Sequence, residues 1–177
     1  MTKITGRVWT FGDNISADNG IIQYSKVPDL GTFDIPALKA MLFVLLDPDF
    51  PQKVREGDIV VAGRNFAHHS HPHACVAMIE SGIRACVVES TDSAFIRKGL
   101  NYGLPIVPCR GITEIAATGD EIETDLGTGI ARNLHTGDER RFRPYCDSML
   151  QVWRLGGLAP ALRERVAAAT AFMNGPK

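Results

Sequence analysis

Residues 57–107 read GDIVVAGRNFAHHSHPHACVAMIESGIRACVVESTDSAFIRKGLNYGLPIV. Three short apolar runs in this stretch, bounded by glycine and other turn residues, indicate buried strands. They are Ile59–Ala62, Ile83–Val88 and Leu104–Val107. Between them lie two helix-forming segments, Ala74–Ser81 and Ser93–Tyr102, and each is followed by a glycine, a common helix terminator. Strands and helices that alternate at this spacing predict a parallel, right-handed unit of an α/β fold.

The flanking segments extend this unit. Upstream, Gly6–Phe11 alternates as a strand does, and Ile35–Leu46 has helical spacing with a proline suited to a first turn. Downstream, alternating segments separated by turn residues predict β-hairpins. These segments are Asp120–Leu126, Ile130–Leu134 and Arg140–Arg143. Two more helices are expected at Ser148–Leu155 and at about 159–172. Without repeats or linkers, the chain is predicted to form one domain over residues 1–177.

Composition narrows the class of protein. Hydrophobic residues make up 45% of the chain and charged residues 22%, with a net charge of −1, so no basic surplus points to nucleic acid. The longest apolar run, Ala40–Leu46, is too short to cross a membrane, and the N-terminus lacks an apolar signal region. We therefore expect a cytoplasmic protein that binds neither nucleic acid nor membrane.

The four cysteines are predicted to be buried, reduced thiols. They are Cys75, Cys86, Cys109 and Cys146, and no two have the C-x-x-C spacing of a zinc or cluster site. Each lies in an apolar or strand-like context, where a free cysteine packs as a small hydrophobic residue.

A set of segments, in order along the chain, resembles the small subunits of 3-isopropylmalate dehydratases, members of the aconitase swivel-domain family. The residues that carry the resemblance are Gly12–Asp18 with Ile21 and Ile22, Leu46–Phe50, Gly57–Phe66, Gly103–Pro105, Gly119–Glu121, Asn133–Gly137 and Gly156–Leu158. No single segment is diagnostic, but together they span the chain from about Gly6 to Val166.

The resemblance implies an aconitase-like swivelling β/β/α domain. It implies a large partner subunit, in a heterodimer or heterotetramer, that carries an iron–sulfur (4Fe-4S) cluster, while this chain itself holds no cofactor. It also implies reversible dehydration of a hydroxy-dicarboxylic acid, to which this chain would supply a serine base and a substrate-binding loop.

The loop after the first strand of the parallel unit departs from the family pattern. There the family continues from asparagine-phenylalanine with glycine, a variable residue, glycine, two serines, arginine, an acidic residue and histidine. Here residues 65–74 read NFAHHSHPHA, which is one residue shorter and has no arginine. Ser70 aligns with a family serine and is the candidate base, and His73 aligns with the family histidine and is expected to be structural.

Two further arginines of the family are also missing. Ser90–Ala94 replaces a segment that normally contains one, and Gln23–Val27 replaces another. Lys26 in the second segment is a possible cationic substitute that binds the substrate, although lysine cannot form the bidentate contacts of a guanidinium. Asp18 aligns with an acidic family residue near the active site, and its alternative role is to stabilise a turn.

Four of the five histidines lie between residues 68 and 73, which leaves three interpretations open. His68, His69 and His71 could bind substrate carboxylates or exchange protons with Ser70, because imidazole titrates near neutral pH. They could bind a metal, although adjacent histidines need a sharp bend to share one ion. They could also be a solvated loop without a function.

We predict a hydro-lyase small subunit that is inactive without its large subunit. The alternatives are a paralogue without catalytic activity, or with another substrate, that still partners a large subunit, and a metal-binding module on the same fold. The missing arginines favour the paralogue, and the retained Ser70 favours the enzyme.

Overall fold

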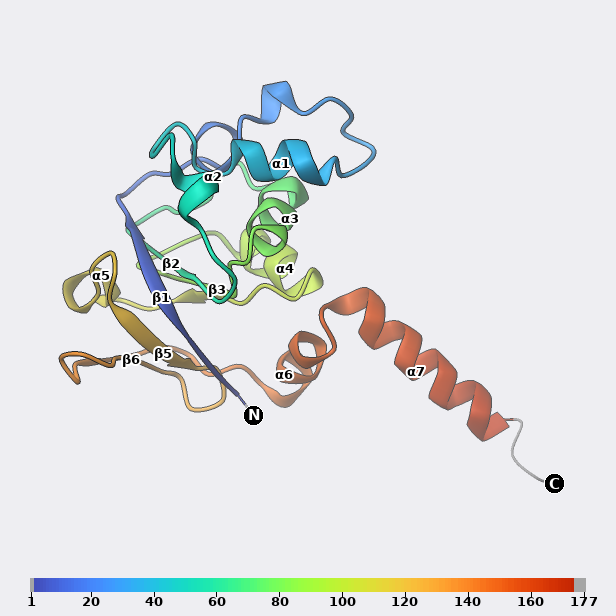
Figure 1. Cartoon of the computed structure of the whole chain (residues 1–177). Helices are drawn as coiled ribbons and strands as arrows, with labels where there is room; N and C mark the ends of the chain where they lie inside the picture. Colours follow the sequence, from blue (N-terminus) through green and yellow to red (C-terminus); the bar gives the residue numbers. More distant parts are fainter. Residues whose placement is uncertain (1, 174–177) are drawn as a thin grey trace.

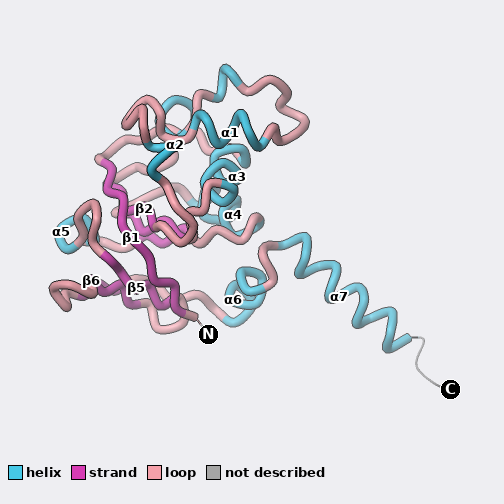
Figure 2. The backbone as a smooth tube through the Cα atoms, viewed as in Figure 1, coloured by secondary structure: helices cyan, strands magenta, loops and turns pink. Residues whose placement is uncertain are grey.

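The structure, a computed structural model, describes residues 2–173, apart from the side chain of Phe172. Seven strands in this part form one mixed sheet in the order β4-β3-β2-β1-β5-β6-β7 (Figures 1 and 2). The strands are β1 (Lys3–Phe11), β2 (Ile59–Ala62), β3 (Ala85–Val88), β4 (Ile106–Pro108), β5 (Glu121–Asp125), β6 (Ile130–Asn133) and β7 (Glu139–Arg141).

The predicted parallel unit is confirmed, because β2, β3 and β4 pair side by side in parallel. The predicted hairpins are confirmed as the antiparallel strands β5, β6 and β7. The long strand β1 joins the two parts, since its second half pairs in parallel with β2 and its first half pairs antiparallel with β5.

The helices in the described residues lie mainly on one side of the parallel strands or after the hairpins (Figure 1). They are a π-helix η1 (Ala17–Ile21), a 3-10 helix η2 (Tyr24–Lys26), α1 (Ile35–Met41), α2 (Phe50–Lys53), α3 (Pro72–Glu80), α4 (Ser93–Asn101), α5 (Ile112–Ile115), α6 (Asp147–Arg154) and α7 (Leu158–Met173). The predicted terminal helix is confirmed as α7. No helix within residues 2–173 is both long and apolar enough to cross a membrane.

Three details of the prediction were wrong. Helix α1 ends at Met41 instead of Leu46, because Phe43 adopts a left-handed conformation (φ 52°) and its amide donates to the Ile21 carbonyl at 2.7 Å. The short helix α2, with Pro51 in its first turn, follows α1 and was not predicted. The short helix α5 was not predicted.

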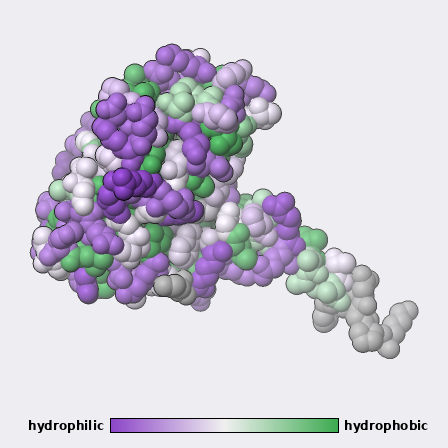
Figure 3. Space-filling view, viewed as in Figure 1, coloured by the Kyte–Doolittle hydropathy of each residue, from purple (hydrophilic) through white to green (hydrophobic). Residues whose placement is uncertain are grey.

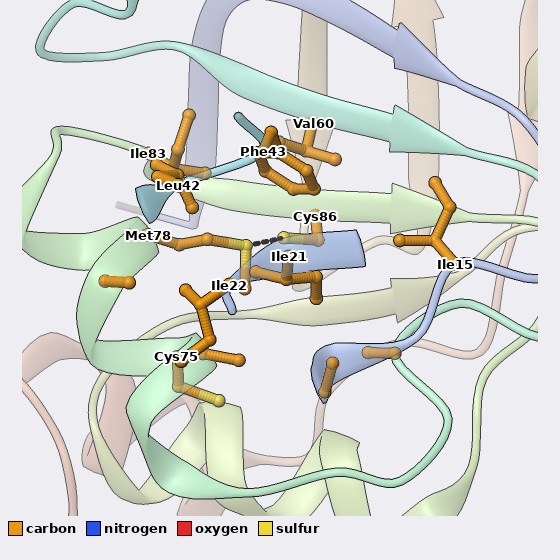
Figure 4. Packing of buried hydrophobic residues seen from close by; sticks show 14 of the residues in the cluster. Ile15, Ile21, Ile22, Leu42, Phe43, Val60, Cys75, Met78, Ile83 and Cys86 are labelled. Atoms are coloured by element: carbon orange, nitrogen blue, oxygen red, sulfur yellow. Dashed lines mark hydrogen bonds between the residues drawn. The ribbon is translucent and has the colours of Figure 1, made fainter. Parts of the chain in front are cut away.

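The core has two layers, one on each face of the parallel strands. Alternate residues of β2 and β3 face opposite layers, and both sets are buried: Val60, Ala62, Cys86 and Val88 on one face, Ile59, Val61, Ala85 and Val87 on the other. Figure 4 shows the first layer, where Ile21 and Ile22 lie beside Phe43 and Cys86 Sγ is 3.7 Å from Met78 Sδ. This burial on both faces is typical of parallel sheets.

The cysteine prediction is confirmed for three residues and wrong for one. All four thiols are free, and Cys75, Cys86 and Cys109 are buried, but Cys146 is exposed at the start of α6.

Helix α7 extends away from the body of the molecule (Figure 1). Its exposed apolar residues are Leu158, Leu162, Val166 and Met173. In Figure 3 hydrophobic and polar residues are mixed along this projecting part, as they are on the visible face of the body.

Asp58, which precedes β2, anchors the start of β2 to β1. Its carboxylate accepts hydrogen bonds from Arg7 Nη2 at 2.7 Å, from Trp9 Nε1 at 2.7 Å and from the Arg55 amide at 2.8 Å. Only 3% of Asp58 is exposed. Burial by itself would raise the pKa of Asp58, but the hydrogen bonds from Arg7, Trp9 and Arg55 outweigh it and hold the pKa below its ordinary value.

We expect Asp58→Ala to lower the free energy of unfolding by roughly 2 kcal/mol at pH 7, because it leaves the partly buried donors of Arg7, Trp9 and Arg55 without this acceptor. Since the folded-state pKa is depressed, the Asp58 contribution is present above the unfolded pKa, about 4, and is lost as pH falls below it. Urea unfolding at pH 7 and pH 3 measures both effects. The variant should lose less stability than the wild type between these pH values, whereas the exposed control Glu80→Ala should behave as the wild type does. An equal loss in both proteins would contradict this role.

Candidate functional site

The loops that follow β1, β2 and β3 meet at one edge of the sheet, beyond the carboxyl ends of these strands. The Asn14 amide donates to the Arg64 carbonyl at 2.8 Å, and isolated β-bridges join Ser16 to His68 and Phe66 to Thr91. Ligands of α/β sheets usually bind outside the carboxyl ends of parallel strands. The candidate site therefore lies where the fold favours a ligand.

The backbone of the loop after β2 is held in an unfavourable conformation. Asn65, Ala67 and His69 all have φ between 55° and 59°, in the left-handed region. The Ala67 amide donates to the Ile15 carbonyl at 2.7 Å, which fixes this path against the loop after β1. Residues other than glycine pay about 1–2 kcal/mol for this conformation, and such strain is typical of functional sites.

Ala67 and His69 stand where the family pattern has its two glycines. The positive φ at both positions explains why the family has glycine there. Because Ala67 shares this conformation, the strain belongs to the loop as a whole, and a role of the His69 imidazole stays a prediction.

We expect His69→Gly to raise the free energy of unfolding by about 0.5–1 kcal/mol, because glycine adopts a positive φ without strain. Urea unfolding of the isolated chain measures the change. The matched control His69→Ala removes the same imidazole but keeps the β-carbon, so it should give no such gain. A His69→Gly variant less stable than the wild type would show that the imidazole itself holds the loop.

Ser70 is half-buried at the end of the loop, just before α3. Its hydroxyl oxygen accepts a hydrogen bond from Lys98 Nζ at 3.1 Å. Lys98 lies on α4, so the contact joins this helix to the loop after β2. The sequence prediction missed Lys98, because helical spacing alone does not show which side of α4 faces the loop.

His71 and Asp18 form a close pair beside Ser70. His71 is 8% exposed, its Nε2 lies 3.1 Å from Asp18 Oδ1, and its ring stacks on Tyr24 with the centroids 3.9 Å apart. Within the described residues, neither ring nitrogen of His71 has a partner with good hydrogen-bond geometry.

Burial lowers the pKa of His71, and the Asp18 charge offsets this only in part. His71 is therefore neutral at pH 7. It is thus not a cationic ligand for a substrate carboxylate at this pH.

The remaining histidines point in different directions. His69 is exposed, with Nδ1 3.7 Å from Asp18 Oδ2, and His68 Nε2 lies 3.2 Å from the Asn14 carbonyl. His73 is buried between the edges of Tyr24 and Phe33, as a structural residue would be. In the described part of the chain, no three histidine, cysteine or acidic side chains are placed to hold a metal. The metal interpretation therefore has no geometric support.

Of the other two predicted residues, Asp18 lies beside the histidines and Lys26 lies on helix η2. The Asp18 carboxylate faces His69 and His71, within the site, and does not cap a turn. Lys26 is exposed on η2, two residues after Tyr24, and its ammonium makes no ion pair within residues 2–173. The structure thus brings Asp18, His69 and His71 together and places the Ser70 hydroxyl against Lys98, while substrate binding by Lys26 stays a prediction.

A cavity of the protein lies away from these loops. A cavity of about 610 Å³ opens between α4, β4 and α6, and its lining contains none of the predicted site residues. Its walls include Ile96, Ile106, Pro108, Tyr145 and Met149. The candidate site is instead an open arrangement of loops at the surface, which suits completion by another chain.

Comparison with known proteins gives consistent similarities over most of the chain. No model of a protein family matches it. It is 37% identical over 169 residues to the isopropylmalate/citramalate isomerase small subunit of Methanocaldococcus jannaschii, covering 93% of this chain and 96% of that protein. It is 40% identical over 158 residues to the methanogen homoaconitase small subunit of Methanothermobacter thermautotrophicus, covering 88% of each. A crystal structure of 3-isopropylmalate dehydratase from M. jannaschii superposes with a TM-score of 0.82 at 29% identity, covering 95% of this chain and 98% of that one.

Proposed function

Because this chain belongs to the family of 3-isopropylmalate dehydratase small subunits, we propose that it supplies Ser70 and the surrounding loops to a large subunit that completes the active site. The family membership and the structural similarity confirm the predicted fold class and the assignment as a hydro-lyase small subunit. The two subunits would form a heterodimer or heterotetramer. The proposed substrate is a hydroxy-dicarboxylic acid.

The observation that carries this proposal is the position of Ser70. It lies at the carboxyl edge of the parallel strands, at the end of a strained loop, with the Lys98 ammonium at 3.1 Å, and the next residue, His71, pairs with Asp18. A hydroxyl oxygen held in this way can take the proton from the carbon next to a substrate carboxylate and return it on rehydration. The Asp18, His68 and His69 side chains would orient the substrate, and His71 would fix Asp18.

The donor atoms of this chain do not suit an iron–sulfur cluster, which needs several converging thiolates. Cys75 lies on α3, Cys86 on β3 and Cys109 in the loop after β4, and burial raises the pKa of Cys75 to about 12 and that of Cys109 to about 11. These thiols therefore stay protonated. We place the cluster on the large subunit, where it would help the substrate hydroxyl to leave.

Two alternatives are weaker. A metal-binding module lacks converging ligands in residues 2–173. A partner without catalytic activity accounts for the missing arginines, but it gives no reason for a strained loop that presents a serine to a lysine. Turnover of isopropylmalate and of citramalate by the chain, with and without the large subunit, tests the proposal.

A further inference from the structure

Lys98 is held in place by the packing of α4. Gly99, the next residue, lies so close to β4 that a β-carbon there would come within 2.5 Å of Ile106 Cγ1 and 2.6 Å of the Leu104 carbonyl oxygen. The N-terminus of α4 is capped by Asp92, whose carboxylate accepts from the Phe95 amide at 2.6 Å. The backbone of α4 is thereby fixed at both sides of Lys98, so its side chain approaches the loop from a defined direction.

The charge of Lys98 has no acidic partner within residues 2–173. Lys3 and Lys53 are the lysines of this part that form ion pairs, with Glu123 and with Asp47 and Asp49. The half-buried Lys98 ammonium instead donates to the Ser70 hydroxyl, and its charge also reaches the buried Cys75 thiol. A partly desolvated cation without a carboxylate is costly unless an anion forms beside it.

We propose that Lys98 is the cation that enables Ser70 to act as a base, in place of the arginine missing from the loop. The proposal rests on the proposed function, in which Ser70 is that base. A serine hydroxyl is a poor base unless its alkoxide is stabilised, and an adjacent ammonium favours the charged form. The proton released when the alkoxide forms passes to solvent, to which the half-buried Ser70 is open.

Dehydration begins with removal of a proton from the substrate by Ser70. The Ser70 alkoxide takes a proton from the substrate carbon, and the electron pair of that C–H bond forms the carbon–carbon double bond as the hydroxyl leaves. The proton on Ser70 and the departing hydroxide together make one water. On rehydration one water gives its proton to the Ser70 alkoxide and its hydroxide to the substrate, and Ser70 passes that proton to carbon. Lys98 stays protonated throughout and donates to Ser70 Oγ.

A double-mutant cycle in the reconstituted two-subunit enzyme tests this role. With isopropylmalate, or with citramalate if that is the acid the wild-type complex turns over, Lys98→Met should lower kcat by about 10², the scale for one donor to a developing anion. KM should change less than about threefold. Adding Lys98→Met to Ser70→Ala should cost almost nothing further, because the two residues act as a unit. Lys98→Arg, which keeps the charge, should recover most of the activity.

The neighbouring control Arg97→Met removes an exposed cation of α4 and should leave kcat unchanged. Circular dichroism and thermal unfolding check that each variant is folded, and Lys98→Gln replaces Lys98→Met if the latter is not. Three results would overturn the role of Lys98. They are a wild-type kcat in Lys98→Met, a rise in its KM at constant kcat, and a loss of kcat in the double variant equal to the product of the losses in the two single variants. Wild-type turnover by Ser70→Ala would instead remove the base itself, so the two failures can be told apart.

Discussion

The purified chain alone is expected to leave isopropylmalate and citramalate unchanged, and to gain turnover when a large subunit encoded by the same genome is added. The physical reason is that this chain offers a base but, in its described part, no converging ligands for a Lewis acid to draw off the hydroxyl. The open placement of Ser70 at the surface leaves room for the second chain. Absorbance of the unsaturated acid measures the reaction, and size-exclusion chromatography measures the complex.

The same preparation allows a check of the cofactor assignment. The isolated chain should be colourless after anaerobic reconstitution with iron and sulfide, whereas the complex should be brown with both elements in stoichiometric amounts. The large subunit alone serves as the control for cluster binding. Turnover by the isolated chain, or a stable cluster on it, would show that the active site is complete within this chain.

Ser70→Ala is expected to lower kcat of the reconstituted enzyme by roughly 10² or more, which is the scale for a positioned acid or base. KM should change much less, because the interaction with the migrating proton is made mainly in the transition state. Steady-state kinetics on the acid that the wild-type complex turns over measures both constants. Complex formation should be unaffected, which separates loss of the base from loss of the partner.

Ser93→Ala is the matched control for this substitution. Ser93 is an exposed serine at the start of α4 and does not contact Ser70, so its removal should leave kcat within about twofold of the wild type. If Ser70→Ala turned over as fast as Ser93→Ala, the base would lie elsewhere, and the interpretation as a partner without catalytic activity would gain support.

The loop after β2 differs from the family pattern at several positions. The loop lacks the arginine of the family pattern, Lys98 of α4 donates to Ser70, and Ala67 and His69 stand at the positions of the two family glycines. Histidines then surround Asp18, where the buried His71 is neutral at pH 7 because burial lowers its pKa. The loop therefore presents a less positively charged surface to the substrate than one that carries arginine.

Much of the fold followed from local patterns. Apolar runs such as Ile59–Ala62, bounded by turn residues, become strands buried on both faces, and the helices between them follow because parallel strands need a crossover. Ser70 could be found because it follows one of those strands in a recognisable segment. These features depend on residues close together in the sequence, so the spacing of apolar residues predicts them directly.

Other features depended on contacts between residues far apart in sequence. The early end of α1 follows from the hydrogen bond between the Phe43 amide and the Ile21 carbonyl, which no helical spacing reveals. The neutral state of His71 depends on its burial against Tyr24. The contact of Lys98 with Ser70 joins residues 28 positions apart and exists because α4 packs on β4 with Gly99 inward. Local sequence fixed which groups were available for chemistry, and long-range packing decided which of them meet, because the direction of a side chain is set by the elements that pack around it.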